Sequence, residues 1–167
     1  VSLDAAVELT QPQAMKLALT GATTLTLDLQ RKGFALADAK FDLRADTSAV
    51  QNLAAKLEAK RVLYRPETRQ IELDALQLAL AGRQGGQGGI GFELGLDWPQ
   101  LSVAGEQLKG SALQGRFKTT GANALAGKLA SKAPSGSFEA LRLPGVALTV
   151  EGNAGPRKLS ANLNADL

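Results

Sequence analysis

The feature that most constrains the fold is a regular alternation of apolar and polar residues across the stretch 53–81. Apolar residues occupy odd-numbered positions over 53–59 and 71–73, and even-numbered positions over 76–80. A period of two is that of a β-strand with one apolar and one wet face. The polar segment between the two runs contains Pro66, which presets a turn dihedral. The stretch therefore predicts two long strands joined by a short hairpin turn.

The change from odd to even numbering between Leu73 and Leu76 predicts a bend in the sheet. A slip of one residue would turn every later side chain to the wrong face, unless a β-bulge absorbs it. We expect such a bulge at Asp74-Ala75. The same change of phase occurs near Ala37-Asp38 and again near Gly110–Ala112. A sheet with repeated bulges curls.

The rest of the chain repeats the pattern of an alternating run, a turn and another alternating run. It predicts roughly ten to twelve strands and no long helix, which is typical of an all-β, antiparallel protein. A short helix over 47–52 is an alternative, because Ala, Lys and Glu favour helix. Turns are expected at the Gly-rich segment 82–89 and at 134–137. The apolar runs occur at these positions: 3–9, 15–19, 25–29, 34–36, 41–43, 53–59, 71–80, 90–96, 101–103, 113–117, 125–129, 141–143, 146–150 and 159–167.

The composition indicates a thin or elongated core. Hydrophobic residues make up 44% of the chain but aromatic residues only 4%, so Leu and Ala must supply most of the apolar surface. A length of 167 residues suits one domain, spanning 1–167. The sequence begins and ends inside strand patterns, as expected for a segment of a larger protein.

Several classes of function are excluded by what the chain lacks. It has no Cys and no His, which excludes disulfides, thiolate chemistry, imidazole metal sites and His-based catalytic triads. The net charge of +3 is mild and scattered, so no basic patch for nucleic acid is indicated. No apolar run is long enough to span a bilayer. We expect a non-enzymatic protein without cofactor or metal.

Two polar features could form sites but have simpler explanations. Glu72 and Asp74 share a strand face and could form a carboxylate pair, but charges on strands usually mark the solvated face. Arg61, Arg65 and Arg69 could bind an anion such as a lipid phosphate, but exposed Arg at a hairpin end needs no partner.

Two further features also have simpler explanations. The Gly-rich segment 82–89 lacks the Lys-Ser/Thr of a phosphate-binding loop and is better explained as a flexible hairpin loop. Trp98 could stack on a sugar, but a packing role at a strand end is favoured, since Trp buries its ring.

What remains is a surface, the continuous apolar stripe along many strands. Two such sheets could close over one another as an elongated sandwich, which the residue pattern alone favours because apolar faces are usually covered. Alternatively, one curled sheet could form a trough or half-barrel whose open apolar face binds acyl chains. In that case the lipid-facing residues would be Leu25, Leu27, Leu29, Leu53, Leu57, Ile71, Leu73, Leu76, Leu78 and Leu80.

Three stretches carry a resemblance to a known family. They are the hairpin 61–80 (RVLYRPETRQIELDALQLAL) and the runs 96–105 (LDWPQLSVAG) and 136–145 (GSFEALRLPG). With their Tyr-x-Pro turn and alternating Leu residues they resemble the AsmA family. The resemblance covers most of the chain as a general alternating pattern rather than as a fixed motif, and it identifies no catalytic residue.

The resemblance implies a Gram-negative envelope protein. AsmA-like proteins resemble long, curled β structures that are anchored in the inner membrane by an N-terminal helix and project into the periplasm. They are linked to outer-membrane biogenesis and to phospholipid passage between the membranes. This chain would then be a periplasmic segment without the anchor. Its expected partners are phospholipid or another lipid, or else envelope assembly proteins that bind its strand edges by β-augmentation.

Overall fold

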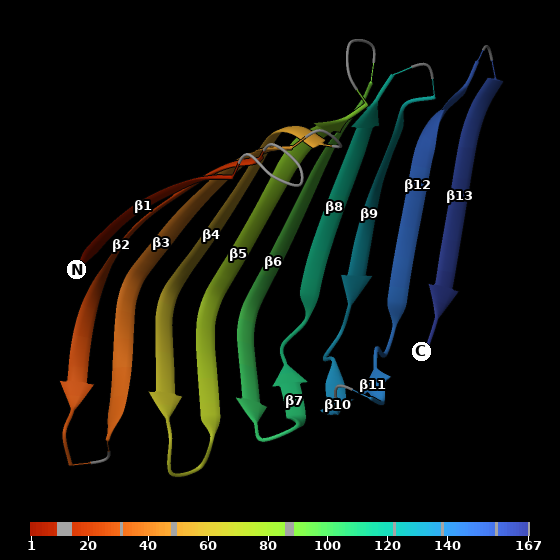
Figure 1. Ribbon diagram of the computed structural model, residues 1–167. Coiled ribbons are helices and arrows are strands. Elements are labelled where there is room, and N and C mark those ends of the chain that lie inside the picture. The colour runs from red at the N-terminus through yellow and green to blue at the C-terminus, as the bar shows by residue number, and fades with distance from the viewer. Residues whose placement is uncertain are drawn as a thin grey trace.

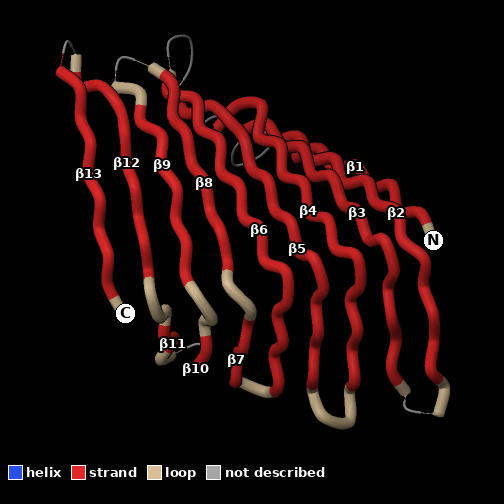
Figure 2. The backbone as a smooth tube through the Cα atoms, turned by 180° about the vertical axis from the view of Figure 1, so that it is seen from behind, coloured by secondary structure: helices blue, strands red, loops and turns tan. Residues whose placement is uncertain are grey.

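The fold was analysed in a computed structural model, which describes residues 1–9, 15–30, 32–47, 50–85, 89–121, 123–137, 139–155 and 157–166. Within these ranges the chain is built from strands and turns and contains no helix (Figure 2). The all-β prediction is confirmed. The strands are β1 (Ser2–Leu9), β2 (Met15–Asp28), β3 (Gly33–Thr47), β4 (Val50–Arg65), β5 (Gln70–Gln84), β6 (Ile90–Ala104), β7 (Gln107–Gly110), β8 (Leu113–Thr120), β9 (Leu125–Ser131), β10 (Ser135–Ser137), β11 (Leu141–Arg142), β12 (Val146–Ala154) and β13 (Arg157–Ala165).

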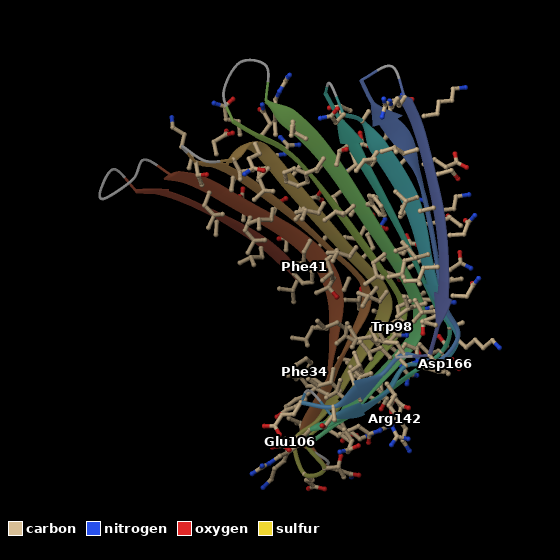
Figure 3. The ribbon with its side chains drawn as sticks, turned by 90° about the vertical axis from the view of Figure 1, so that its right-hand side faces the viewer. Phe34, Phe41, Trp98, Glu106, Arg142 and Asp166 are labelled. Atoms are coloured by element: carbon tan, nitrogen blue, oxygen red, sulfur yellow. The ribbon has the colours of Figure 1, made fainter. Side chains whose placement is uncertain are left out.

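All thirteen strands of the described residues belong to one open antiparallel sheet (Figure 1). The main path runs β1-β2-β3-β4-β5-β6-β8-β9-β12-β13, and the short strands β7, β10 and β11 extend the sheet below β8, β9 and β12. The sheet curls into a trough with a C-shaped profile (Figure 3). The sandwich that the residue pattern favoured is not formed, because there is no second sheet among the described residues to cover the apolar face.

The curl begins at changes of phase that the sequence predicted. Between the pairs Ala22–Lys40 and Thr24–Ala37, β3 has one residue more than β2, and Asp38 has a left-handed φ of 51°. Ala75 has a φ of 52° in β5. A bulge bends a strand and increases its twist, so the bulge predicted at 37–38 is confirmed. At 74–75 the strand changes phase at a left-handed residue, but β5 keeps its register with β4 and with β6, so no extra-residue bulge is formed there.

Asp38 and Ala75 lie on one line across the sheet, and the long strands bend (Figure 3). A second register shift, between β4 and β5 at Gln51/Ala54, lies away from this line, and Asn52 has a φ of 51° there. The pairing of β5 with β6 skips Ala75 and, opposite it, Pro99. Proline has no N–H to donate to a neighbouring strand. The gap in the pairing therefore falls at a residue of β6 that could not donate a hydrogen bond there. Further along, β7 ends at Gly110 and β8 begins at Leu113, which is where the third change of phase was found. The line therefore runs from β2 to the gap between β7 and β8.

The predicted thin core is confirmed, and part of it lies on this line. Ala39 and Ala59 face each other in β3 and β4 and are 1% and 3% exposed. The small Ala side chains suit the inside of a bend, where neighbouring strands crowd. The other buried apolar side chains of the described residues are Ala45, Leu108, Leu113, Pro134 and Val146. Most of the apolar surface lies outside this small set.

Several predicted boundaries were wrong. The runs 15–19 and 25–29, separated by Gly21, form one strand, β2, because Gly21 keeps its place in the ladder opposite Phe41. The runs 34–36 and 41–43 form β3, on either side of the predicted change of phase. The runs 90–96 and 101–103 form one strand, β6, which continues past Pro99.

Three turns or alternatives also need correction. The helix considered at 47–52 is absent from its described residues, because Thr47 ends β3 and 50–52 begin β4; residues 48–49 lie outside the described part. The predicted loop 82–89 begins later than expected, since Gly82 to Gln84 pair with β6; residues 86–88 are outside the described part. Residues 135–137 form β10 through pairing with β7 and not a turn.

Candidate functional site

The concave side of the trough carries the apolar side chains. Phe34, below the line through Asp38 and Ala75, and Phe41, above it, both lie on this side (Figure 3). Without the extra residue at Asp38 the two rings would lie on opposite faces, because strand side chains alternate. The bulge at Asp38 thus keeps both halves of β3 apolar toward the same hollow.

Two apolar rows cross the upper half of the sheet from one edge to the other. We call them the central row and the neighbouring row; each has one residue from each of the ten strands of the main path. The central row is Leu3, Gly21, Phe41, Leu57, Leu78, Leu96, Gly115, Leu129, Leu148 and Leu163. The neighbouring row is Ala5, Leu19, Leu43, Ala55, Leu80, Leu94, Phe117, Gly127, Val150 and Ala161.

These rows are open to solvent. Leu78, Leu94 and Leu163 are 38%, 47% and 53% exposed, although each is surrounded by apolar neighbours in its row. Single exposed leucines are ordinary, but a contiguous exposed apolar surface marks a binding site or an interface. The concave face is therefore the candidate site.

The lower half of the trough continues the apolar lining from β2 to β6. Leu36 pairs with Leu25 on one side and with Val62 on the other, and Val62 pairs with Leu73. Leu73 then pairs with Leu101. The lining therefore has an upper and a lower half, and the lower half extends over β2 to β6.

Aromatic rings on the concave face lie over glycines of neighbouring strands. A Cβ atom built at Gly21 would lie 2.6 Å from Cδ1 of Phe41, and one built at Gly82 would lie 2.7 Å from Cζ of Phe92. Phe117 covers Gly127 and the indole of Trp98 covers Gly110 in the same way. These glycines make room for rings, which lie flat on the sheet.

Gly115 in the central row is different, because no ring covers it. The nearest side-chain atom to a Cβ built there is Cβ of Leu129 at 3.4 Å, an ordinary contact. Its missing side chain leaves a hollow of about 300 Å³ on the concave face. The residues around this hollow, besides Gly115 itself, are Leu78, Leu80, Leu94, Gly95, Leu96, Arg116, Phe117 and Leu129. Its lining is apolar and its size suits a hydrocarbon group.

The structure places most of the residues that were predicted to face lipid on this concave face. Register puts Leu57, Leu78 and Leu80 in the two rows and Leu53, opposite Ala45, beside them. Leu76 is opposite Trp98. Leu25, Leu27, Ile71 and Leu73 line the lower half. Leu29 is the exception, since it lies in the turn after β2 and is 85% exposed.

The prediction missed the C-terminal half of the same face. Leu94, Leu96, Phe117, Leu129, Leu148 and Leu163 belong to the rows as fully as the predicted residues do. Their alternation was visible in the sequence. It did not reveal that these strands join the same sheet in the same register, which requires long-range pairing.

Trp98 has the packing role that was favoured for it, though in the middle of β6 rather than at a strand end. Its ring covers Gly110, and its Nε1 donates a hydrogen bond of 3.0 Å to the carbonyl oxygen of Ser111. Ser111 also bonds the backbone of Gln100. The indole thus ties β6 to the segment where β7 gives way to β8.

The carboxylates considered for acid–base chemistry form ion pairs on the polar side of the sheet. Glu72 accepts hydrogen bonds from Arg65, at 2.7 Å, and from Arg61, at 3.3 Å. Asp74 pairs with Arg61 at 3.4 Å. Arg61 and Arg65 therefore pair with carboxylates on the neighbouring strand of their own hairpin. Arg69 lies in the turn and has a φ of 48°. The arrangement stabilises the hairpin. Glu72 and Asp74 also line an open hollow of about 570 Å³, together with Arg61 and Lys109.

A metal centre finds no support in the described part of the chain. It contains no group of three or more acidic, His or Cys side chains that could hold an ion. Among the same residues, no helix has the length and apolar character to cross a membrane.

Comparison with known proteins adds no family assignment. No family model, no curated protein and no solved structure matches this chain. The functional interpretation consequently depends on the sheet itself.

Proposed function

We propose that the chain is a non-enzymatic module that binds phospholipid, with the acyl chains lying against the concave apolar face. The observation that carries the proposal is a single-layer sheet whose apolar face is uncovered across ten strands. Burial of apolar surface is non-directional and yields about 0.8 kcal/mol for each methylene group. A lining of Leu, Ala and Val can therefore hold a hydrocarbon chain without any polar residue that recognises it.

The same geometry supports transfer along the trough. The central and neighbouring rows run across the strands, so the trough extends from the β1 edge to the β13 edge and is open at both ends. An acyl chain that moves from one strand to the next exchanges one set of Leu contacts for an equivalent set. Such movement needs neither a cofactor nor a covalent step.

The resemblance to the AsmA family supports a cellular setting for this activity. We propose a periplasmic module of a Gram-negative envelope protein that acts in outer-membrane biogenesis, with inner-membrane anchoring supplied by the parent protein. The Leu-rich hairpin formed by β4 and β5, which carries the clearest resemblance, supplies Leu57, Leu78 and Leu80 to the rows.

The alternation of the strands offers a matched test. A photoreactive amino acid is placed at Leu78 or Leu129 on the concave face, and in control proteins at Gln77 or Lys128, which are the next residues on the opposite face. Expression in a Gram-negative host and illumination should yield lipid adducts at the first two positions, and native mass spectrometry should detect bound phospholipid. Equal adducts on both faces, or none on the concave one, would refute the proposal.

A second candidate is an assembly module that binds envelope proteins through its strand edges. It is favoured by the two free edges, because β1 pairs only with β2 and β13 only with β12 in the described residues. Crosslinks to proteins from Asp4 or Asn162, together with an absence of lipid adducts at Leu78, would support it over lipid binding.

A further inference from the structure

The two free edges of the sheet have complementary chain directions. The ten strands of the main path are antiparallel to their neighbours, so β1, the first, and β13, the tenth, run in opposite directions. If β13 of one copy lies beside β1 of another with both troughs facing the same way, the pair is antiparallel. The two edges lie on opposite sides of the sheet (Figure 1), so they cannot meet within one molecule.

The hydrogen-bonding groups at the β1 edge belong to even-numbered residues. Val1 and Thr23 exchange both of their backbone hydrogen bonds, at 2.6 and 3.0 Å. Because such pairs alternate in antiparallel sheets, the odd-numbered residues of β1 bond to β2. The N–H and C=O groups of Ser2, Asp4, Ala6 and Glu8 then point to the free edge.

The β13 edge presents even-numbered residues as well. Asn153 of β12 donates to the carbonyl of Ala124, so the odd-numbered residues of β12 bond toward β9 and the even-numbered ones toward β13. The partners of those even-numbered residues are odd, as in the pair Leu148–Leu163. The even-numbered residues of β13, from Lys158 to Asn164, are left to face the free edge.

One register satisfies both the backbone and the apolar rows. It sets the even-numbered residues of the two strands opposite one another, as hydrogen bonding requires. It also sets Leu163, the last residue of the central row, opposite Leu3, the first residue of that row in the next copy. Ala161 and Ala5, the ends of the neighbouring row, are then opposite each other too. Both apolar rows continue across the junction without a step.

The charges of the two edge strands complement each other. β1 carries Asp4 and Glu8 and no cation, whereas β13 carries Arg157 and Lys158 and no anion. Asp4 comes opposite the neutral Asn162 in the register that the apolar rows select. Opposite charges on facing strands stabilise a pair, and like charges destabilise it.

We propose that copies of this chain associate head to tail, β13 of one pairing with β1 of the next, to form a longer trough. The contact is heterologous and does not close on itself, so it can be repeated. This inference depends on edge direction, register and charge and not on whether the trough holds lipid, so the two proposals can fail separately.

Disulfide trapping tests the register in a chain that contains no Cys. Leu3→Cys and Leu163→Cys proteins are mixed and oxidised; the two positions form a non-hydrogen-bonded pair about 4.5 Å apart between Cα atoms, which a disulfide can bridge. The mixture should give covalent dimers. The Leu3→Cys protein alone, and its mixture with Leu159→Cys, which is displaced by about 13 Å, should not. Absence of dimers in the first mixture, or equal yields in the controls, overturns the proposal.

Charge exchange tests the association in solution. The mass of the unmodified chain, measured by sedimentation, should rise with concentration. Asn162→Asp, which places a second anion opposite Asp4, should weaken association by about tenfold, and the double variant Asp4→Lys/Asn162→Asp should restore it. A chain that stays monomeric at every concentration, or a double variant no better than the single one, contradicts the proposal.

Discussion

The ring of Phe41 lies directly over Gly21 of the neighbouring strand, so that a Cβ atom at Gly21 would come within 2.6 Å of Cδ1 of the ring. Both residues belong to the central row on the concave face. The ring fills the space that a side chain at position 21 would occupy. The pairing of β2 with β3 continues through Gly21 without a break. The pairing shows how a sheet with few aromatic residues uses each of them to cover backbone.

Gly21→Ala should destabilise the protein by about 1–3 kcal/mol, since the added methyl group forces the Phe41 ring from its position. The measurement is the free energy of unfolding in urea. Gly115→Ala is the matched control in the same row; its Cβ would meet only an ordinary contact, so its stability should be unchanged or slightly higher. If Gly21→Ala and Gly115→Ala behave alike, ring packing does not explain the glycine at 21. The double variant Gly21→Ala/Phe41→Ala should show a favourable coupling energy.

Ala75→Gly should stabilise the protein by about 1 kcal/mol. Ala75 has a φ of 52°, a left-handed conformation that costs a residue with a Cβ roughly 1–2 kcal/mol and costs glycine almost nothing. The gain appears as a higher urea midpoint with an unchanged slope. Ala79→Gly, in the regular part of the same strand, should instead lose about 0.5–1 kcal/mol. A loss at both positions would mean that the backbone at Ala75 is not strained in solution.

Glu72→Gln should lower stability by about 1 kcal/mol, because Arg61 and Arg65 both lose an ionised partner in a half-buried position. The loss should shrink at high salt, which screens the remaining charges. Unfolding at low and high ionic strength measures both effects. Glu67→Gln, in the exposed turn of the same hairpin, should leave stability unchanged. An equal effect of both substitutions would show that the network contributes nothing specific.

The sequence predicted the local features of this fold better than its global form. The change of phase near Asp38 located a bulge, and the change near Ala75 located a left-handed residue at which β5 changes phase without a register shift. The ends of the strands were harder to predict. Gly21 resembles a turn residue until its place under Phe41 is known, and 135–137 form a strand only because β7 lies beside them.

Alternation also could not decide between an open trough and a sandwich. An apolar face has the same pattern whether a second sheet covers it or not, and that difference depends on which strands pair over long distances. For the same reason the predicted site stopped at Leu80, whereas the row continues through Leu96 and Leu129 to Leu163.

Gly115→Leu should reduce phospholipid binding without loss of stability, if the concave face holds acyl chains as proposed. The new side chain would fill the hollow bounded by Leu78, Leu94 and Phe117, where an acyl chain would otherwise lie. A strand position with free space accepts Leu, so the urea midpoint should be equal or higher. Gln114→Leu adds the same side chain to the opposite face and should leave binding unchanged. The readout is the fraction of protein that carries phospholipid in native mass spectrometry, which should fall severalfold only in the first variant. Equal binding by both variants would exclude this hollow as the place where the lipid lies.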